Sequence, residues 1–138
     1  MNAIRLEADL VRHEGLRLYP YKDSVDKLTI GVGRNIEDNG ITKREAMYLL
    51  QHDIDRSIQN TQHAVLSYSK LDDTRQEVLV NMVFNLGLPK FAGFQKMLAA
   101  VERQDFVAAA VEMLDSRWAK QVGGRATELA RRMQHGEE

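Results

Sequence analysis

The chain has 138 residues, of which 43% are hydrophobic and 28% are charged, the balance of an ordinary globular protein. The formal net charge is −1 and no basic stripe stands out, which excludes nucleic acid as the main ligand. There is no cysteine, so disulfides and thiolate metal sites are excluded as well. Glu7 and Asp9 interrupt the apolar pattern of the N-terminus, so we expect neither a signal peptide nor a membrane span, and a protein that stays where it is made.

The first predicted element is a helix over residues 3–14, whose apolar side chains recur at helical spacing. Gly15 is suited to end this helix in a left-handed conformation. Glu14 is therefore expected in the last helical turn, carried by a rigid element. Pro20 then pushes the chain towards extended geometry, and the helix cannot continue through it.

Two short extended runs follow, "YPYKD" and "KLTIGVG", with "SVD" as the turn between them. In the second run the apolar residues alternate with Thr29, Gly31 and Gly33. One face of this strand is therefore nearly bare of side chains, which is typical of a place where a ligand or another backbone comes close.

The turn cluster "NIEDNG" precedes a clear helix start, because Thr42 and Glu45 form a capping box. The pattern predicts a long helix to about residue 66, with one apolar stripe and one wet face. Behind it we expect a buried central helix that ends at Gly87, followed by four shorter helices within residues 91–134. Four methionines are expected in the core of these helices: Met82, Met97, Met113 and Met133.

The predicted fold class is α+β and mainly helical, with a small β-hairpin or sheet lobe joined by a long helix to a helical lobe. We expect one domain over residues 1–138. Its mixed α/β lobe should span about residues 13–45, and its helical lobe about residues 66–138 together with residues 1–12.

Two carboxylates, Glu14 and Asp23, flank the short loop between the first helix and the glycine-rich strand. Acid/base work on a substrate between two such groups is what glycoside hydrolysis needs: one protonated acid for the leaving oxygen and one ionised partner on the other face of the sugar. Each carboxylate taken singly is more often an ordinary surface group, and Asp23 before Ser24 also suits a plain turn residue. The pattern alone leaves these alternatives open.

The run "EGLRLYPYKDSVDKLTIGVG" closely resembles the active-site segment of the phage-type lysozymes, the T-even bacteriophage endolysins of glycoside hydrolase family 24. That family reads Glu-Gly-x-Arg-Leu, then Tyr-Lys-Asp, then Thr-Ile-Gly-x-Gly. The resemblance continues through "ITKREA", "NMVFNLG", "AGF" and "SRWAKQ", so it covers most of the chain in order. It implies a lysozyme-like fold.

The resemblance also implies roles. Glu14 would be the general acid, Asp23 the ionised partner that activates water or stabilises the transition state, and Thr29 would help to position the water, with inversion at the anomeric centre. Arg125 would approach Glu14. The residues expected to line the cleft and meet the glycan or its peptide stem are Phe84, Asn85, Gln121 and Arg125. The family needs no metal or organic cofactor.

By resemblance the protein is a muramidase that cuts the β-1,4 bond between N-acetylmuramic acid and N-acetylglucosamine in peptidoglycan. It would be a monomer made in the host bacterial cytoplasm and released by a holin to the periplasm and cell wall. Two alternatives stay open: a lytic transglycosylase, in which Asp23 and Thr29 would have no role, and a catalytically silent wall-binding protein. A tail-associated lysozyme is a further variant of the biological setting.

The sequence departs from the family at three places. Arg34 stands where a histidine is usual, so an ion pair built on that histidine must be absent or rebuilt. Asp26 replaces a turn glycine, although aspartate tolerates left-handed geometry. The link from Gly33 to Ile41 is much shorter than in larger members, which predicts a trimmed β-lobe. The near-neutral charge predicts weaker attraction to the anionic wall than in basic members.

Overall fold

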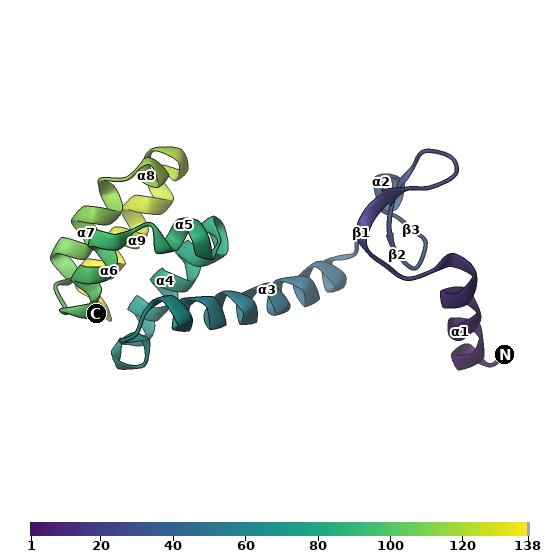
Figure 1. The fold of residues 1–138 in the computed structure, drawn as a ribbon, viewed down its shortest axis with the longest axis horizontal. Helices are drawn as coiled ribbons and strands as arrows, with labels where there is room; N and C mark the ends of the chain where they lie inside the picture. The colour runs from purple at the N-terminus through teal and green to yellow at the C-terminus, as the bar shows by residue number, and fades with distance from the viewer. Residues whose placement is uncertain (138) are drawn as a thin grey trace. The chain divides into compact units, whose positions relative to one another are not determined.

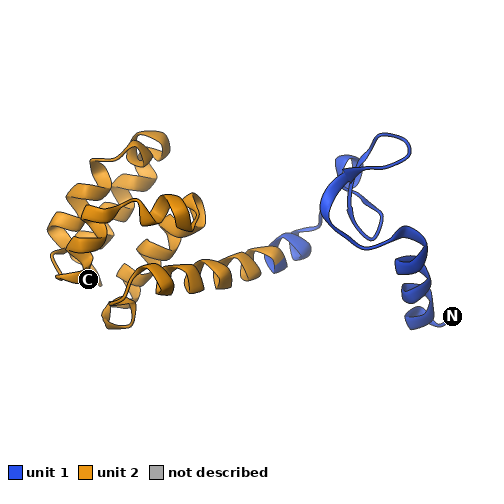
Figure 2. Ribbon diagram, viewed as in Figure 1, with its two compact units in different colours: residues 1–48 blue, residues 49–138 orange. Residues whose placement is uncertain are grey.

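The structure, a computed structural model, describes residues 1–137 and divides the chain into two compact units, Met1–Tyr48 and Leu49–Glu138 (Figures 1 and 2). Most of the described residues are helical, and the strands form one three-stranded antiparallel sheet. The predicted α+β, mainly helical class is therefore confirmed. No helix within the described residues is long and apolar enough to cross a membrane. The predicted grouping of residues 1–12 with the helical lobe stays a prediction.

Unit 1 begins with α1 (Ala3–Glu14), the helix that the sequence predicted. The side chain of Asn2 caps its start by accepting a hydrogen bond from the Arg5 amide at 3.0 Å. Gly15 ends it with a positive φ of 78°, and its amide donates to the Val11 carbonyl at 2.9 Å. A residue with a Cβ would be strained in that conformation, which explains why the helix stops directly after Glu14.

The sheet of unit 1 follows in the order β1 (Arg17–Lys22), β2 (Leu28–Gly31) and β3 (Arg34–Asn35). The predicted hairpin is confirmed as β1 and β2. Its turn places Asp26 at a φ of 64°, the left-handed geometry that aspartate was expected to tolerate. The short strand β3 was not predicted.

A single helical turn, α2 (Ile36–Asn39), lies where the sequence predicted only a turn cluster, and that prediction was wrong. The side chain of Asn35 caps this turn by accepting from the Asp38 amide at 3.0 Å. Lys27 then forms ion pairs with Glu37 at 3.5 Å and with Asp38 at 3.3 Å, which tie the turn to the hairpin. Asparagine and acidic residues suit turns and helix starts equally, so composition alone did not separate the two.

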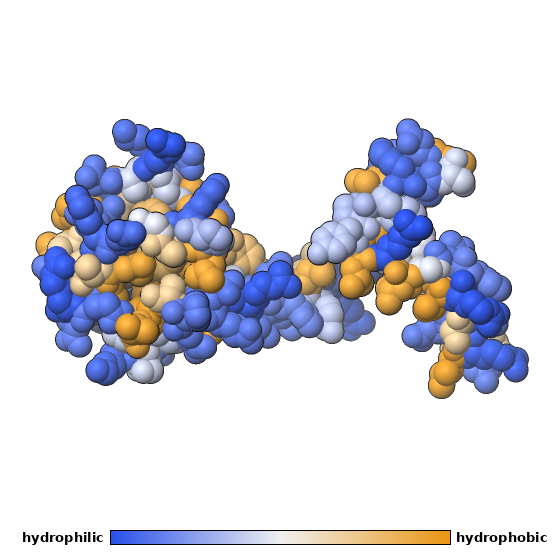
Figure 3. All heavy atoms as spheres, viewed as in Figure 1, coloured by the Kyte–Doolittle hydropathy of each residue, from blue (hydrophilic) through white to orange (hydrophobic). Residues whose placement is uncertain are grey.

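The long helix is α3 (Lys43–Ala64), and its predicted capping box is present. The Glu45 amide donates to Thr42 Oγ1 at 3.1 Å, while the Thr42 amide donates to Glu45 Oε1 at 2.9 Å. Polar side chains cover much of this helix on the face drawn in Figure 3, in agreement with the predicted polar, solvent-facing side. Within α3 the buried side chains are those of Ser57 and Thr61.

Unit 2 holds the main hydrophobic core. After η1 (Tyr68–Lys70), its remaining helices are α4 (Asp73–Leu86), α5 (Leu88–Ala92), α6 (Gln95–Glu102), α7 (Phe106–Leu114), α8 (Arg117–Val122) and α9 (Gly124–His135). The predicted central helix is α4, which ends at Gly87, and the four predicted core methionines are all buried. The predicted helix from residue 91 is divided between α5 and α6, because the chain leaves helical geometry at Phe94 (ψ 57°).

Candidate active site

Glu14 is the last residue of α1, and its carboxylate rests against the backbone of Gly33. A Cβ at Gly33 would lie 2.9 Å from Glu14 Oε2 and 3.2 Å from its Cδ, so the Glu14 side chain would have to shift. Gly33 also has a positive φ of 68°. The backbone conformation therefore favours glycine, a Cβ would displace the Glu14 carboxylate, and the turn after β2 forms one wall of the Glu14 site.

Asp23 is half-buried and organises the hairpin turn. Its Oδ1 accepts hydrogen bonds from the amides of Val25 at 2.9 Å and Lys27 at 2.8 Å. The role as a turn residue, which the sequence left open, is thus real. Both bonds use Oδ1, and no residue in the described part of the chain binds Oδ2, so one carboxylate oxygen stays accessible to a bound water or sugar.

The structure describes every residue of unit 1, and among them Thr29 alone is buried, with 2% of its surface exposed. Its hydroxyl donates to the Lys27 carbonyl at 2.8 Å. Asp23 and Thr29 are therefore both attached to the main chain of Lys27, one through its amide and the other through its carbonyl. The hydroxyl oxygen of Thr29 keeps its lone pairs as acceptors.

Arg34, one of the departures named in the sequence analysis, forms an ion pair with Glu45. Arg34 Nη1 lies 3.1 Å from Glu45 Oε1, and Nη2 lies 2.8 Å from Oε2, a two-pronged contact. Arg34 Nη1 also donates to the Gly40 carbonyl at 3.2 Å. The hydrogen bond from Arg34, and next the one from the Thr42 amide, lower the pKa of Glu45 to about 2. We call this contact the Arg34–Glu45 clasp.

The clasp should make the stability of unit 1 depend on pH. Because the folded-state pKa of Glu45 is depressed from 4.5 to about 2, its contribution is complete above the unfolded value and is lost as the pH falls towards 2. We expect the melting temperature of wild type to exceed that of Glu45→Gln at pH 6, and the difference to close as the pH approaches 2. Thermal melts across this range check it; a constant difference would contradict it.

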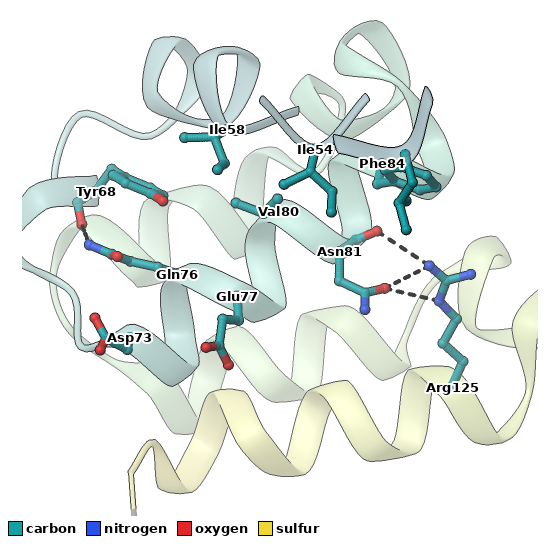
Figure 4. A pocket seen from close by; sticks show the side chains of 11 residues that line it. Ile54, Ile58, Tyr68, Asp73, Gln76, Glu77, Val80, Asn81, Phe84 and Arg125 are labelled. Carbon is teal, nitrogen blue, oxygen red and sulfur yellow. Dashed lines mark hydrogen bonds between the residues drawn. The ribbon is translucent and has the colours of Figure 1, made fainter. Parts of the chain in front are cut away.

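In unit 2, two of the predicted substrate-binding residues, Phe84 and Arg125, line one groove of about 470 Å³ (Figure 4). Arg125 donates from Nη2 and Nε to Asn81 Oδ1, at 2.7 and 3.0 Å. Aliphatic residues of α3 and α4 form a further part of the wall: Leu50, Ile54, Ile58 and Val80. The predicted approach of Arg125 to Glu14 joins residues of different units and stays a prediction.

The other two predicted binding residues, Asn85 and Gln121, lie at the ends of α4 and α8. Asn85 Oδ1 accepts a hydrogen bond at 2.8 Å from the indole of Trp118, which is 3% exposed. Phe94 packs edge-on against that indole with ring centroids 6.2 Å apart. Gln121, Phe94 and Trp118 line a second hollow of about 790 Å³. Three of the four predicted binding residues therefore line hollows of one unit, Phe84 and Arg125 the first and Gln121 the second, whereas Asn85 lines neither of these two.

The bond between Asn85 and Trp118 should be measurable. In Asn85→Ala the buried indole N–H loses its acceptor, and we expect unfolding free energy to fall by about 1–3 kcal/mol. Asn85→Asp keeps an oxygen at the same place and is the matched control. Because Trp118 is the single tryptophan of the chain, denaturant unfolding followed by its fluorescence checks this; equal stability of the two variants would contradict it.

The described residues contain no group of three or more histidine, aspartate or glutamate side chains placed to hold a metal ion. Sequence reasoning missed three contributors: the close approach of Gly33 to Glu14, the partnership of Arg34 with Glu45, and that of Asn81 with Arg125. One signal was available in the sequence: glycines leave one face of the second predicted strand nearly without side chains, and Gly33 is one of them.

Comparison with known proteins gives the class. The sequence model of the phage lysozyme family matches residues 11–135, and the chain belongs to that family. The family makes it a glycosidase of the muramidase type that acts on peptidoglycan.

Individual relatives agree. The chain is 28% identical to "Probable T4-type lysozyme 2" of Dictyostelium discoideum and 27% identical to "Probable T4-type lysozyme 1", in both cases over 88% of this chain and 89% of the relative. It is also 31% identical to the pre-baseplate central spike protein Gp5 of Enterobacteria phage T4, over 87% of this chain but only 26% of that protein.

Proposed function

We propose that the protein hydrolyses the β-1,4 bond between N-acetylmuramic acid and N-acetylglucosamine, with inversion at the muramic acid C1. The observation that carries this proposal is the setting of Glu14. Glu14 is the last residue of the helix α1, and its carboxylate rests on the Gly33 backbone. Asp23 and Thr29 belong to the same unit.

In this mechanism Glu14 gives its proton to the glycosidic oxygen as the C1–O bond breaks, which releases the N-acetylglucosamine O4 as a hydroxyl. A water attacks C1 from the opposite face, and Asp23 accepts one of its protons. The hydrogen bonds to Asp23 Oδ1 support this role, because they fix the carboxylate and leave Oδ2 for the water. The Thr29 hydroxyl oxygen is the proposed second acceptor for that water.

The proposed substrate contacts in unit 2 are Phe84, Asn85, Gln121 and Arg125. Phe84, 44% exposed, offers an apolar face of the kind on which a sugar ring packs. Arg125 is held by Asn81, which leaves guanidinium N–H groups for carboxylates or amides of the peptide stem. No metal or organic cofactor takes part in the proposed reaction.

Product analysis tests the reaction type. Digestion of purified peptidoglycan, followed by mass spectrometry of the new ends, should yield hydrated muramic acid reducing ends. Anhydro-muramic ends would instead identify a lytic transglycosylase, and the absence of products would identify a silent wall-binding protein. Either result would overturn the proposal.

For the biological setting we propose an endolysin: a monomer stored in the host cytoplasm and released by a holin to the peptidoglycan of the periplasm. Expression in bacteria without a holin should leave cells intact until the inner membrane is permeabilised, and lysis should follow at once. Spontaneous lysis without permeabilisation would contradict holin dependence. The likeness to a spike protein makes a tail-associated role the second candidate.

A further inference from the structure

The turn that carries Gly33 has few bonds of its own. β3 is two residues long and pairs with β2 at two positions. Gly31 and Gly33 both have positive φ angles, 73° and 68°, and a glycine backbone loses more freedom on ordering than any other. The surface on which the Glu14 carboxylate rests therefore needs an anchor outside the sheet.

Arg34, the next residue in the chain, supplies such an anchor. Its guanidinium donates hydrogen bonds to both Glu45 carboxylate oxygens, at 3.1 and 2.8 Å, and to the Gly40 carbonyl at 3.2 Å. Glu45 is itself fixed by the Thr42 amide, at the first turn of α3. A planar guanidinium bound at two oxygens fixes direction as well as distance, which a single ammonium cannot do.

The contribution of the clasp to overall stability should be small. The side chains of Arg34 and Glu45 are 43% and 40% exposed, and exposed ion pairs stabilise proteins little. What the clasp does fix is the path of the backbone between Gly33 and α3. Its main consequence is therefore geometric, at the atoms that Gly33 contacts.

We infer that Arg34 is a positioning residue for Glu14: held by Glu45, it keeps the Gly33 turn against the carboxylate and so keeps the acid aligned with the glycosidic oxygen. The inference rests on the proposed function, in which Glu14 is the acid. Small misplacements of catalytic groups cost large factors, up to about a hundredfold for roughly 1 Å.

The test compares Arg34→Met with Arg34→Lys and with Arg132→Met. Arg132 forms an ion pair with Glu77 at 2.8 Å, with side chains 32% and 62% exposed, so its variant removes a comparable surface pair far along the sequence. On soluble peptidoglycan oligomers we expect Arg34→Met to lower kcat about tenfold with KM little changed. The kcat of Arg34→Lys, whose ammonium group can still bind one Glu45 oxygen, should lie between those of Arg34→Met and wild type. The kcat of Arg132→Met should equal that of wild type.

A second readout does not depend on the reaction. Nuclear Overhauser contacts between the Glu14 side chain and the Gly33 α-protons should be strong in wild type and Arg132→Met, and weak in Arg34→Met. Thermal melts would confirm that each variant is folded at the assay temperature. Unchanged contacts in Arg34→Met, or an unchanged kcat, would overturn the positioning role. If Glu14→Gln instead stayed active, the proposed function itself would fail.

Discussion

Glu14→Gln is expected to abolish most of the hydrolytic activity while leaving the fold intact. A general acid typically contributes a factor of about 10²–10⁴ in rate, which is roughly 3–5 kcal/mol of barrier. The amide has the same shape as the carboxylic acid but cannot give its proton to the leaving oxygen. Glu14 is exposed at the end of α1, so the substitution disturbs no core packing.

The matched control is Glu7→Gln, the same change at another exposed glutamate of α1. Turnover of soluble peptidoglycan oligomers should be normal in Glu7→Gln and lost in Glu14→Gln, with equal melting temperatures. Near-normal turnover in Glu14→Gln would show that another group is the acid.

Gly33→Ala should have the second-largest effect, because two costs coincide at this residue. The positive φ of 68° strains any residue with a Cβ, at a cost of about 1–3 kcal/mol of stability. The new methyl group would also lie 2.9 Å from Glu14 Oε2, so the carboxylate must move. We expect kcat to fall by about a hundredfold, the factor that a displacement of roughly 1 Å can cause.

Gly123→Ala separates the two costs. Gly123 has a similar φ of 58°, but a Cβ there would meet nothing within 4 Å. This control should lose comparable stability and keep its kcat. Equal activity of the two variants, measured well below their melting temperatures, would mean that the contact between Gly33 and Glu14 has no catalytic consequence.

Local signals predicted much of unit 1. Apolar periodicity and Gly15 predicted α1 to its last residue, and the Thr42–Glu45 capping box marked the start of α3. The tolerance of Asp26 for left-handed geometry also held, at a φ of 64°. Each of these features depends on residues only a few positions apart in the chain. Local structure of this kind can be predicted from sequence patterns.

Elements decided by contacts further along the chain were missed. The α2 turn is joined to the hairpin by ion pairs of Lys27 with Glu37 and Asp38, ten and eleven residues away. In α3 the sequence predicted an apolar stripe but not what it faces, and in the structure Leu50, Ile54 and Ile58 of this helix line a groove. Periodicity shows which side chains share a face, but not what covers that face.

The candidate site shows the same division. The motif placed Glu14, Asp23 and Thr29 in one segment, but it did not show that Asp23 and Thr29 both attach to the main chain of Lys27. The partner of Arg34 could not be named, because Glu45 lies eleven residues away across a turn of unexpected form. Side-chain pairing at that distance follows from the fold.

Digestion of peptidoglycan in water enriched with heavy oxygen tests the central claim, acid-catalysed hydrolysis at the muramic acid C1, most directly. With wild-type protein, every new muramic acid reducing end should carry one heavy oxygen, and early products should have inverted anomeric configuration by NMR. Glu14→Gln should release no labelled ends on the same timescale. Unlabelled anhydro ends, labelled glucosamine reducing ends, or labelled muramic ends from Glu14→Gln at the wild-type rate would contradict the account.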